Sequence, residues 1–313
     1  MAPQVTVVGA GVVGLTAAVA LTEAGHDVRV MAATTGDATT SAVAGAIWLP
    51  FQAGPPDRVN AWAARTRTWL EGLAAGEPDA GVDVLDVLVI DQGERPWFAD
   101  AVGPIERVTT DLAGRPAAWK FRAPRVDPRR HLPWLTRRLA RPVELAHVER
   151  LADVPGDVVV NATGLGARTL AGDPTVTALL GQIVVVAPGQ LDLGTSISDD
   201  RLEAADPAAL FYTIPRADEV VLGGCALPHP TATSDADHAP DPAIRDRILR
   251  SAGALGLAPG ALLRQRVGLR PYRPTVRVER DADDARVIHD YGHGGAGYTL
   301  ARGCAEDVVA LVG

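Results

Sequence analysis

The sequence predicts an α/β protein in which one domain is assembled around a parallel sheet from discontinuous segments, and a second, α+β domain carries a mixed or antiparallel sheet. Three observations predict this class. A βαβ unit of roughly thirty residues opens the chain, a second glycine-rich loop precedes the last helix, and the segment between them contains two strands of antiparallel type.

The first elements are a buried strand, a helix and a second strand. Residues 5–8 are a β-branched run stopped by Gly9, which is typical of a central parallel strand. Residues 11–24 are expected to form a helix that ends at Gly25 in the C′ position, and residues 28–31 form the next strand.

Capping residues predict the later helices. Asp57 is expected to cap one helix, and Asp127-Pro128 starts another that Pro133 should bend or shorten. Asp241-Pro242 caps a third, and residues 297–312 form the last. The remaining strands are expected at 82–90, 157–161, 210–215, 219–223, 275–280 and 287–291.

Composition excludes several classes of protein. The 313 residues are 47% hydrophobic, enough for a sizeable core, and the formal net charge of -8 opposes binding to nucleic acid. Lys120 is the only lysine, so the chain has no G-K-[ST] phosphate loop and little capacity for Schiff-base chemistry.

The cysteines and histidines predict no metal site. Cys225 and Cys304 form no C-x-x-C pair, and the seven histidines include no H-E-x-x-H. Whether the two cysteines form a disulfide is left open. The apolar run 5–22 lacks a basic flank and contains three glycines, so we expect no membrane segment and a cytoplasmic location.

The N-terminal loop carries the G-x-G-x-x-G pattern after a strand and at the start of a helix. Gly9 allows the tight turn, Gly11 the approach of a pyrophosphate, and Gly14 the close packing of helix on strand. An ordinary glycine-rich turn is the alternative, and the motif does not separate NAD from FAD. Ala33 stands where an acidic ribose partner is expected, so Thr34, Thr35 or the backbone would contact the ribose.

The second loop, residues 289–299, also opens a helix. A helix start suits the negative charge of a reduced flavin ring, although one such loop could hold no ligand. Arg270, set among apolar residues and prolines, suits bidentate capture of a carboxylate, but it could form a surface salt bridge. Tyr212 is either a packed strand aromatic or a hydroxyl donor to a ligand.

Together these blocks resemble the D-amino-acid oxidase family. The matching segments are residues 7–15, 39–48, 212–215, 267–271 and 293–299, in the family's order along nearly the whole chain. The resemblance implies a Rossmann-type FAD-binding domain of residues 1–52, 140–182 and 264–313, and a substrate-binding domain of residues 53–139 and 183–263.

The resemblance also implies roles for individual residues. Arg270 would pair with the substrate α-carboxylate, the Tyr212 hydroxyl would support it, and the Gly295 carbonyl would accept the α-amino group. Val148 would lie at the adenine. The residues expected to contact FAD are Gly9, Ala10, Gly11, Val12, Val13, Gly14, Thr34, Thr39, Thr40, Ser41, Gly45, Ala46, Ile47, Val148, Thr163, Gly164, Arg270, Gly294, Gly295, Ala296, Gly297, Tyr298 and Thr299.

In this family a D-amino acid passes its α-hydrogen as hydride to flavin N5, and O₂ reoxidises the flavin to give hydrogen peroxide. The imino acid then hydrolyses to a 2-oxo acid and ammonia. No side chain need act as a general base, because orientation and electrostatics carry the reaction. The expected partners are a D-amino acid and O₂, and a homodimer is left open.

Three alternatives remain. A D-aspartate oxidase would need a second cation, for which Arg201 and Arg216 are candidates. A glycine or sarcosine oxidase would share the cofactor loop, and a non-catalytic dinucleotide-binding sensor would need neither Arg270 nor Tyr212. Mammalian family members carry a lid tyrosine where this chain has Ala208, so we expect a short, open entrance.

Overall fold

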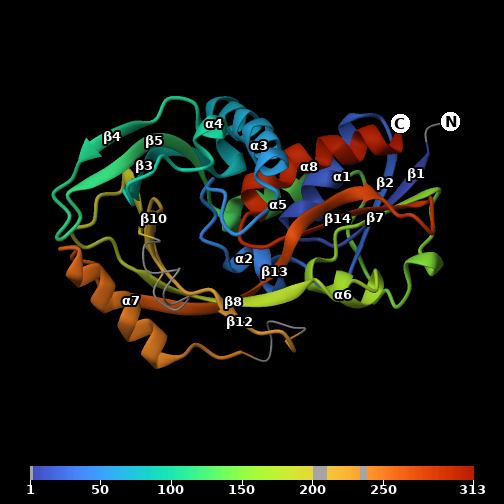
Figure 1. Ribbon diagram of the computed structural model, residues 1–313. Helices are drawn as coiled ribbons and strands as arrows, with labels where there is room; N and C mark the ends of the chain where they lie inside the picture. Colours follow the sequence, from blue (N-terminus) through green and yellow to red (C-terminus); the bar gives the residue numbers. More distant parts are fainter. Residues whose placement is uncertain (1–2, 200–209, 233–237) are drawn as a thin grey trace.

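The computed structural model describes residues 3–199, 210–232 and 238–313 (Figure 1). One continuous sheet of 14 strands runs through this described part of the chain. Its order is β4-β5-β3-β9-β10-β11-β8-β13-β14-β7-β1-β2-β6, with β12 beside β8. The α/β class predicted from the sequence is confirmed.

The parallel part of the sheet is formed by strands from both ends of the chain. β1 (Gln4–Val8) pairs in parallel with β2 (Asp27–Ala32) and with β7 (Val158–Asn161). β14 (Val287–His293) pairs with β7, and the short β6 (Glu144–Leu145) pairs with β2. The prediction of a parallel sheet built from discontinuous segments is therefore confirmed.

The rest of the sheet is mostly antiparallel. β8 pairs with β11 and β13, β10 pairs with β9 and β11, and β5 pairs with β3 and β4, while β3 and β9 are parallel. The bounds are β3 Val82–Ile90, β4 Glu106–Thr109, β5 Ala117–Val126, β8 Thr177–Val186, β9 Thr195–Asp199, β10 Phe211–Pro215, β11 Val220–Gly223 and β12 Leu227–Pro228.

β13 (Leu262–Arg280) joins the two parts of the sheet. It pairs with β8 along its first half and with β14 along its second. Only residues 275–280 of it are predicted as strand from the sequence. The part that is not predicted contains Gly268, Pro271 and Pro274, residue types that are unfavourable inside a strand. The register shift between Tyr272 and Arg277 accommodates this region.

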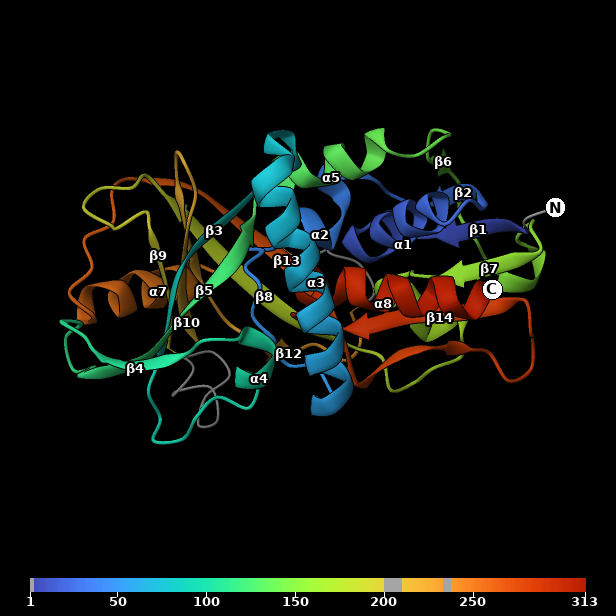
Figure 2. The ribbon, with the colours of Figure 1, turned by 90° about the horizontal axis from the view of Figure 1, so that it is seen from above.

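Helices cover the parallel part of the sheet (Figure 2). α1 (Val12–Glu23) packs against α8 (Gly297–Val312), and α8 in turn packs against α3 (Pro56–Gly76). Side chains from these helices and from β1, β3 and β5 share one core that includes Leu15, Trp62 and Leu300. The other helices are α2 Thr40–Val43, α4 Ala99–Val102, α5 Pro128–Arg137, α6 Ala167–Leu170 and α7 Pro242–Ala254.

Two of the three predicted caps are confirmed. Asp127 accepts from the backbone N–H of Arg129 at 3.0 Å, and Asp241 accepts from that of Ala243 at 2.7 Å. The prediction that Asp57 caps α3 is wrong, because the cap is Pro55 and Asp57 lies in the first turn. Proline at the first helical position has a fixed φ and needs no N–H partner, so the helix begins earlier.

No helix in the described ranges is both long enough and apolar enough to cross a membrane.

Cys225 and Cys304 are both buried free thiols, so no disulfide joins them.

Candidate active site

The glycines of the N-terminal loop form a cradle at the carboxyl ends of β1 and β7. Gly9 has φ +121°, and a Cβ on it would lie 2.3 Å from the carbonyl oxygen of Ala162. A Cβ on Gly14 would lie 2.1 Å from the carbonyl oxygen of Gly9. Both positions therefore require glycine, and α1 starts directly against the strand, as the motif predicts.

The second glycine loop lies beside the first. An ideal Cβ on Gly297 would be 3.5 Å from Val12 and 4.0 Å from Val13, so the first turns of α8 and α1 meet. The first turn of a helix has N–H groups that no helical carbonyl accepts. Two such turns side by side provide donors and positive potential for an anionic group such as a pyrophosphate.

Side chains fix the segment 41–49 to these two helix starts. The Ser41 hydroxyl accepts from the N–H of Val12 at 2.9 Å, and the Tyr298 hydroxyl donates to the carbonyl of Ser41 at 3.0 Å. Thr299 accepts from the N–H of Leu49 and donates to its carbonyl. Burial raises the pKa of Tyr298, so its hydroxyl keeps its proton. The two C-terminal side chains thus bond protein backbone, and their roles toward a cofactor stay predictions.

The predicted ribose and adenine contacts gather near the end of β2. Thr34 is exposed just beyond that strand, and Thr39 is buried, with its hydroxyl donating to the carbonyl of Gly36 at 2.8 Å. Thr40 begins α2. Val148 packs against a buried cluster that includes Val8 of β1 and Val159 of β7. This end of the site is built from hydroxyls and backbone, without an acidic residue directly after β2.

The residues after β7 close the other side of the cradle. Thr163 donates from its N–H and hydroxyl to the Asn161 carboxamide oxygen, and its nitrogen lies 3.4 Å from where a Gly9 Cβ would be. Gly164 has φ +58° and approaches Pro271. Two predicted cofactor residues therefore lie beside the N-terminal loop.

Residues 45–47 are held against the second part of the sheet. A Cβ on Gly45 would lie 2.5 Å from Ile214 on β10. Ala46 has φ +61°, and its carbonyl accepts from the N–H of Val126 at 2.8 Å. Ile47 forms a bridge with Arg125. Packing explains these three positions, and their contact with a cofactor stays a prediction.

Arg270 and Tyr212 meet, as the resemblance implies. The Tyr212 hydroxyl is within hydrogen-bonding contact of the Arg270 guanidinium. Arg270 Nη1 also donates to the carbonyl of Cys225 at 2.7 Å. Among the described residues, no carboxylate lies within 4.0 Å of this guanidinium. Arg270 is thus a half-buried cation for which the described part of the chain provides no anionic partner.

Glycines on the two intervening strands allow this meeting. β11 and β8 lie between β10, which carries Tyr212, and β13, which carries Arg270. A Cβ on Gly223 of β11 would be 1.9 Å from the Tyr212 ring, and one on Gly181 of β8 would be 2.5 Å from the guanidinium. Both side chains therefore lie flat over glycine. The sequence analysis missed these glycines, although an isolated glycine in a strand signals such close approach.

Phe51 connects this pair to the C-terminal loop. The Arg270 Cζ is 5.8 Å from the centroid of the Phe51 ring, and a Cβ on Gly295 would be 2.5 Å from the same ring. Gly295 is exposed, whereas its neighbours Gly294 and Ala296 are buried. Phe51 therefore lies near both the Arg270 guanidinium and Gly295, and the roles of Arg270, Tyr212 and Gly295 toward a substrate stay predictions. No sequence pattern marked Phe51, because a single aromatic residue in a loop has no periodicity to identify it.

Charge and burial settle the protonation of Tyr212. Burial raises its pKa, and the nearby Arg270 opposes that shift without reversing it. Tyr212 is therefore a neutral hydroxyl that can donate to a carboxylate, as the predicted supporting role requires.

The second cation that a D-aspartate oxidase would need is not supplied by Arg216. This side chain is buried, pairs with Glu219 at 2.8 Å and donates to the carbonyl of Ala44 at 3.2 Å. Its charge is already matched. Arg201 and Ala208, the other positions considered for substrate selection, lie outside the described residues.

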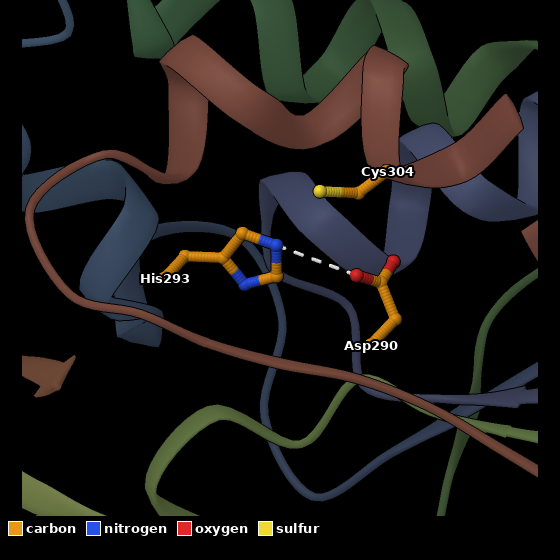
Figure 3. A group of neighbouring side chains, drawn as sticks. All are labelled: Asp290, His293 and Cys304. Atoms are coloured by element: carbon orange, nitrogen blue, oxygen red, sulfur yellow. Dashed lines mark ion pairs between the residues drawn. The ribbon is translucent and has the colours of Figure 1, made fainter. Parts of the chain in front are cut away.

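One group of side chains could hold a metal ion, although the sequence predicts no metal site. Asp290, His293 and Cys304 are buried, and their ligand atoms lie within 4.8 Å of one another (Figure 3). Burial raises the pKa of the Cys304 thiol well above its ordinary value, and the nearby Asp290 carboxylate adds to this shift. Asp290 and His293 lie on β14, before the C-terminal glycine loop, and Cys304 lies on α8, after it.

Comparisons with known proteins show the family of the chain. The family model of the FAD dependent oxidoreductases matches residues 4–311. A D-amino-acid oxidase from Rubrobacter xylanophilus is 40% identical, over 99% of this chain and 96% of the relative. One from Streptomyces coelicolor is 38% identical, over 98% and 96%. A solved glycine oxidase from Geobacillus kaustophilus has a TM-score of 0.80 at 18% identity, covering 99% of this chain and 94% of that one, which shows the fold alone.

Proposed function

The chain belongs to the FAD dependent oxidoreductase family, and from this premise we propose which of its residues bind and orient the substrate. It is a flavoenzyme of the D-amino-acid oxidase type, which converts D-amino acids by oxidative deamination to 2-oxo acids, ammonia and hydrogen peroxide. Its substrates are accordingly a D-amino acid and O₂.

The observation that carries the proposed roles is the unmatched charge of Arg270. A half-buried guanidinium that has no carboxylate partner within residues 3–199, 210–232 and 238–313, beside the neutral Tyr212 hydroxyl, is suited to bind a substrate carboxylate. The planar fork of arginine would donate hydrogen bonds to both carboxylate oxygens, and the Tyr212 hydroxyl would donate one more. These hydrogen bonds would fix the direction of the α-hydrogen, while the Gly295 carbonyl would accept a hydrogen bond from the α-amino group.

The glycine cradle and the two helix starts fit FAD. The pyrophosphate would lie at the first turn of α1 beside Ser41, and residues 294–299 would line the flavin. FAD supplies the redox chemistry when bound: its N5 accepts a hydride, and O₂ reoxidises it. The protein needs no general base for this reaction, so its contribution is orientation and the exclusion of water.

Several finer assignments stay predictions. One is the division into two domains, with residues 1–52, 140–182 and 264–313 in the first and residues 53–139 and 183–263 in the second. Two of its boundaries, 182/183 and 263/264, fall inside the strands β8 and β13. The cytoplasmic location and a homodimer are others.

A dinucleotide-binding sensor and a glycine or sarcosine oxidase are less well supported. A sensor would not need a cation held without a partner next to a tyrosine. The matches to D-amino-acid oxidases extend over nearly the whole chain at about twice the identity of the glycine oxidase structure, 40% against 18%.

We expect the purified protein to be yellow, to release FAD on denaturation, and to form hydrogen peroxide with D-amino acids but not with L-enantiomers. The measurement is an absorbance spectrum followed by a peroxidase-coupled assay over a panel of both enantiomers, with glycine and sarcosine included. Colourless protein that binds NAD instead, or a yellow protein that oxidises only glycine and sarcosine, would contradict the proposal.

We expect neutral and basic D-amino acids to give higher kcat/KM than D-aspartate and D-glutamate. Arg216 is already paired with Glu219, so this cation is not available to an acidic substrate side chain. An apolar pocket discriminates by only about 1–3 kcal/mol per methylene, so the neutral range should be broad. A clear preference for D-aspartate that Arg216→Ala abolishes would overturn this expectation; Arg201→Ala tests the position outside the described residues.

We expect Tyr212→Phe to raise KM by roughly tenfold to a hundredfold and to spare much of kcat. The hydroxyl adds one hydrogen bond to a carboxylate that Arg270 already pairs, and such a bond contributes about 1.5–3 kcal/mol. The ring itself stays over Gly223. Steady-state kinetics with a neutral D-amino acid checks this, and a collapse of kcat at constant KM would instead place the hydroxyl in the transition state.

A further inference from the structure

The strongest unexplained feature of the molecule is the buried group of Asp290, His293 and Cys304. Their side chains are 0%, 3% and 0% exposed. Asp290 and His293 come from β14 and Cys304 from α8, so the group joins the two elements that flank the C-terminal glycine loop. Figure 3 shows the three side chains pointing toward one another.

The backbone brings Asp290 and His293 to the same side. Residues three apart in a regular strand project to opposite faces of the sheet. Gly292 has φ +85°, which interrupts this alternation. Tyr291, between them, bonds to Asp173 at 2.9 Å, away from the group.

The polar atoms of Asp290 and His293 in this group lack hydrogen-bond partners in the part of the chain that the structure describes. Neither carboxylate oxygen of Asp290 has a hydrogen-bond partner among the described residues, and neither does His293 Nε2. The Nε2 to Oδ1 distance is 3.3 Å, which is longer than the 2.7–2.9 Å usual for a charge-assisted hydrogen bond. Buried carboxylates are normally hydrogen-bonded or bound to a cation, so the arrangement points to a missing partner at its centre.

We propose that Asp290, His293 and Cys304 bind one divalent transition-metal ion of the zinc type. Zinc bonds of about 2.0–2.2 Å to nitrogen and oxygen in a tetrahedral site hold those two atoms about 3.3–3.6 Å apart, and the observed 3.3 Å fits. Sulfur and imidazole donors favour zinc over magnesium or calcium. One carboxylate, one thiolate and a neutral imidazole balance a charge of two, which a fully buried site requires.

Binding exchanges one proton for the ion. The metal takes the place of the Cys304 thiol proton, which leaves to solvent, and no electron is transferred. The protein provides three ligands, and a water molecule completes the tetrahedron. The ion would tie the end of β14 to α8 and so hold residues 294–296 between them. This inference does not depend on the substrate or on the flavin reaction.

The test is the metal content of the FAD-loaded enzyme, produced in zinc-supplemented medium and dialysed against EDTA. Elemental mass spectrometry should find close to one zinc per chain, because a buried ion does not exchange with the chelator until the protein unfolds. Unfolding in guanidinium should then release it to a chromogenic chelator. Less than a tenth of an equivalent of any divalent transition metal would overturn the proposal, and the group would then be an imidazole and a carboxylate in contact beside a thiol.

Two further measurements locate the ion. Cys304→Ala should lose the zinc, whereas Cys225→Ala, which alters the other buried thiol, should keep it. Zinc retained by a folded Cys304→Ala variant would overturn the assignment. If that variant does not fold, X-ray absorption of the wild-type protein decides: one sulfur near 2.3 Å with nitrogen and oxygen near 2.0–2.2 Å supports the site, and a shell without sulfur refutes it.

Discussion

Arg270→Leu should lower kcat/KM for a neutral D-amino acid by about 150-fold to 5,000-fold while the protein stays yellow. A buried charge that loses its partner typically costs about 3–5 kcal/mol, and each 1.36 kcal/mol is a factor of ten in rate. The substrate carboxylate would face a leucine and the Tyr212 hydroxyl alone. Steady-state kinetics and the FAD content per chain measure the two parts of this result.

The matched control is Arg280→Leu. Arg280 lies on the same strand, β13, and its guanidinium also donates to backbone carbonyls, those of Ala285 and Leu311. It is outside the group formed by Arg270, Tyr212 and Phe51, so its loss should leave kcat/KM nearly unchanged. Near-normal kinetics in a yellow Arg270→Leu variant would show that another residue holds the substrate. An equal loss in Arg280→Leu would show that the loss is not specific to Arg270.

Gly181→Ala tests the same role without removing the charge. Its Cβ would lie 2.5–2.6 Å from three atoms of the guanidinium, so the end of the Arg270 side chain must move. We expect a higher KM with unchanged FAD content. This would indicate that the placement of the guanidinium matters as well as its presence.

The elements that the sequence predicts well are those with local signals. The glycine pattern at Gly9, Gly11 and Gly14 requires a strand before it and a helix after it, and both are present. The caps at Asp127 and Asp241 depend on one side chain and the next two residues. Such features need no knowledge of the rest of the fold.

The parts that sequence reasoning missed depend on distant partners. β13 forms despite Gly268, Pro271 and Pro274 because β8 and β14 pair with it on its two sides. The convergence of Arg270 with Tyr212 depends on Gly181 and Gly223, which lie on strands between them. Without the family resemblance, no spacing in the sequence would have brought these residues together.

The buried group of Asp290, His293 and Cys304 also could not be predicted from the sequence, because it depends on residues that meet only in the fold. Asp290 and His293 are close in sequence, but Cys304 lies in the following helix, α8. The three residues do not have the spacing of a known metal-binding motif. The three meet only because Gly292 turns the strand and α8 packs back over it.

The second large effect is expected from Gly14→Ala, which should leave the protein with little or no bound FAD and a lower Tm. The new Cβ would lie 2.1 Å from the carbonyl oxygen of Gly9 and 2.9 Å from its carbonyl carbon. Both are backbone atoms, so α1 must move away from β1 and the cradle must open. Overpacking of this kind typically costs about 1–3 kcal/mol, and the displaced helix start also loses its alignment with α8.

Gly72→Ala is the control that separates this clash from the general effect of replacing a helical glycine. Gly72 is exposed in α3, and no atom lies within 4 Å of its ideal Cβ. Because glycine is about 1 kcal/mol less favourable than alanine within a helix, this variant should retain full FAD and a Tm equal to or above that of the wild type. FAD per chain after removal of unbound flavin, with thermal unfolding, distinguishes the two variants. A Gly14→Ala protein with full FAD occupancy would mean that FAD binding does not depend on the close packing of α1 on β1. It would contradict the proposal that the glycine cradle holds the cofactor.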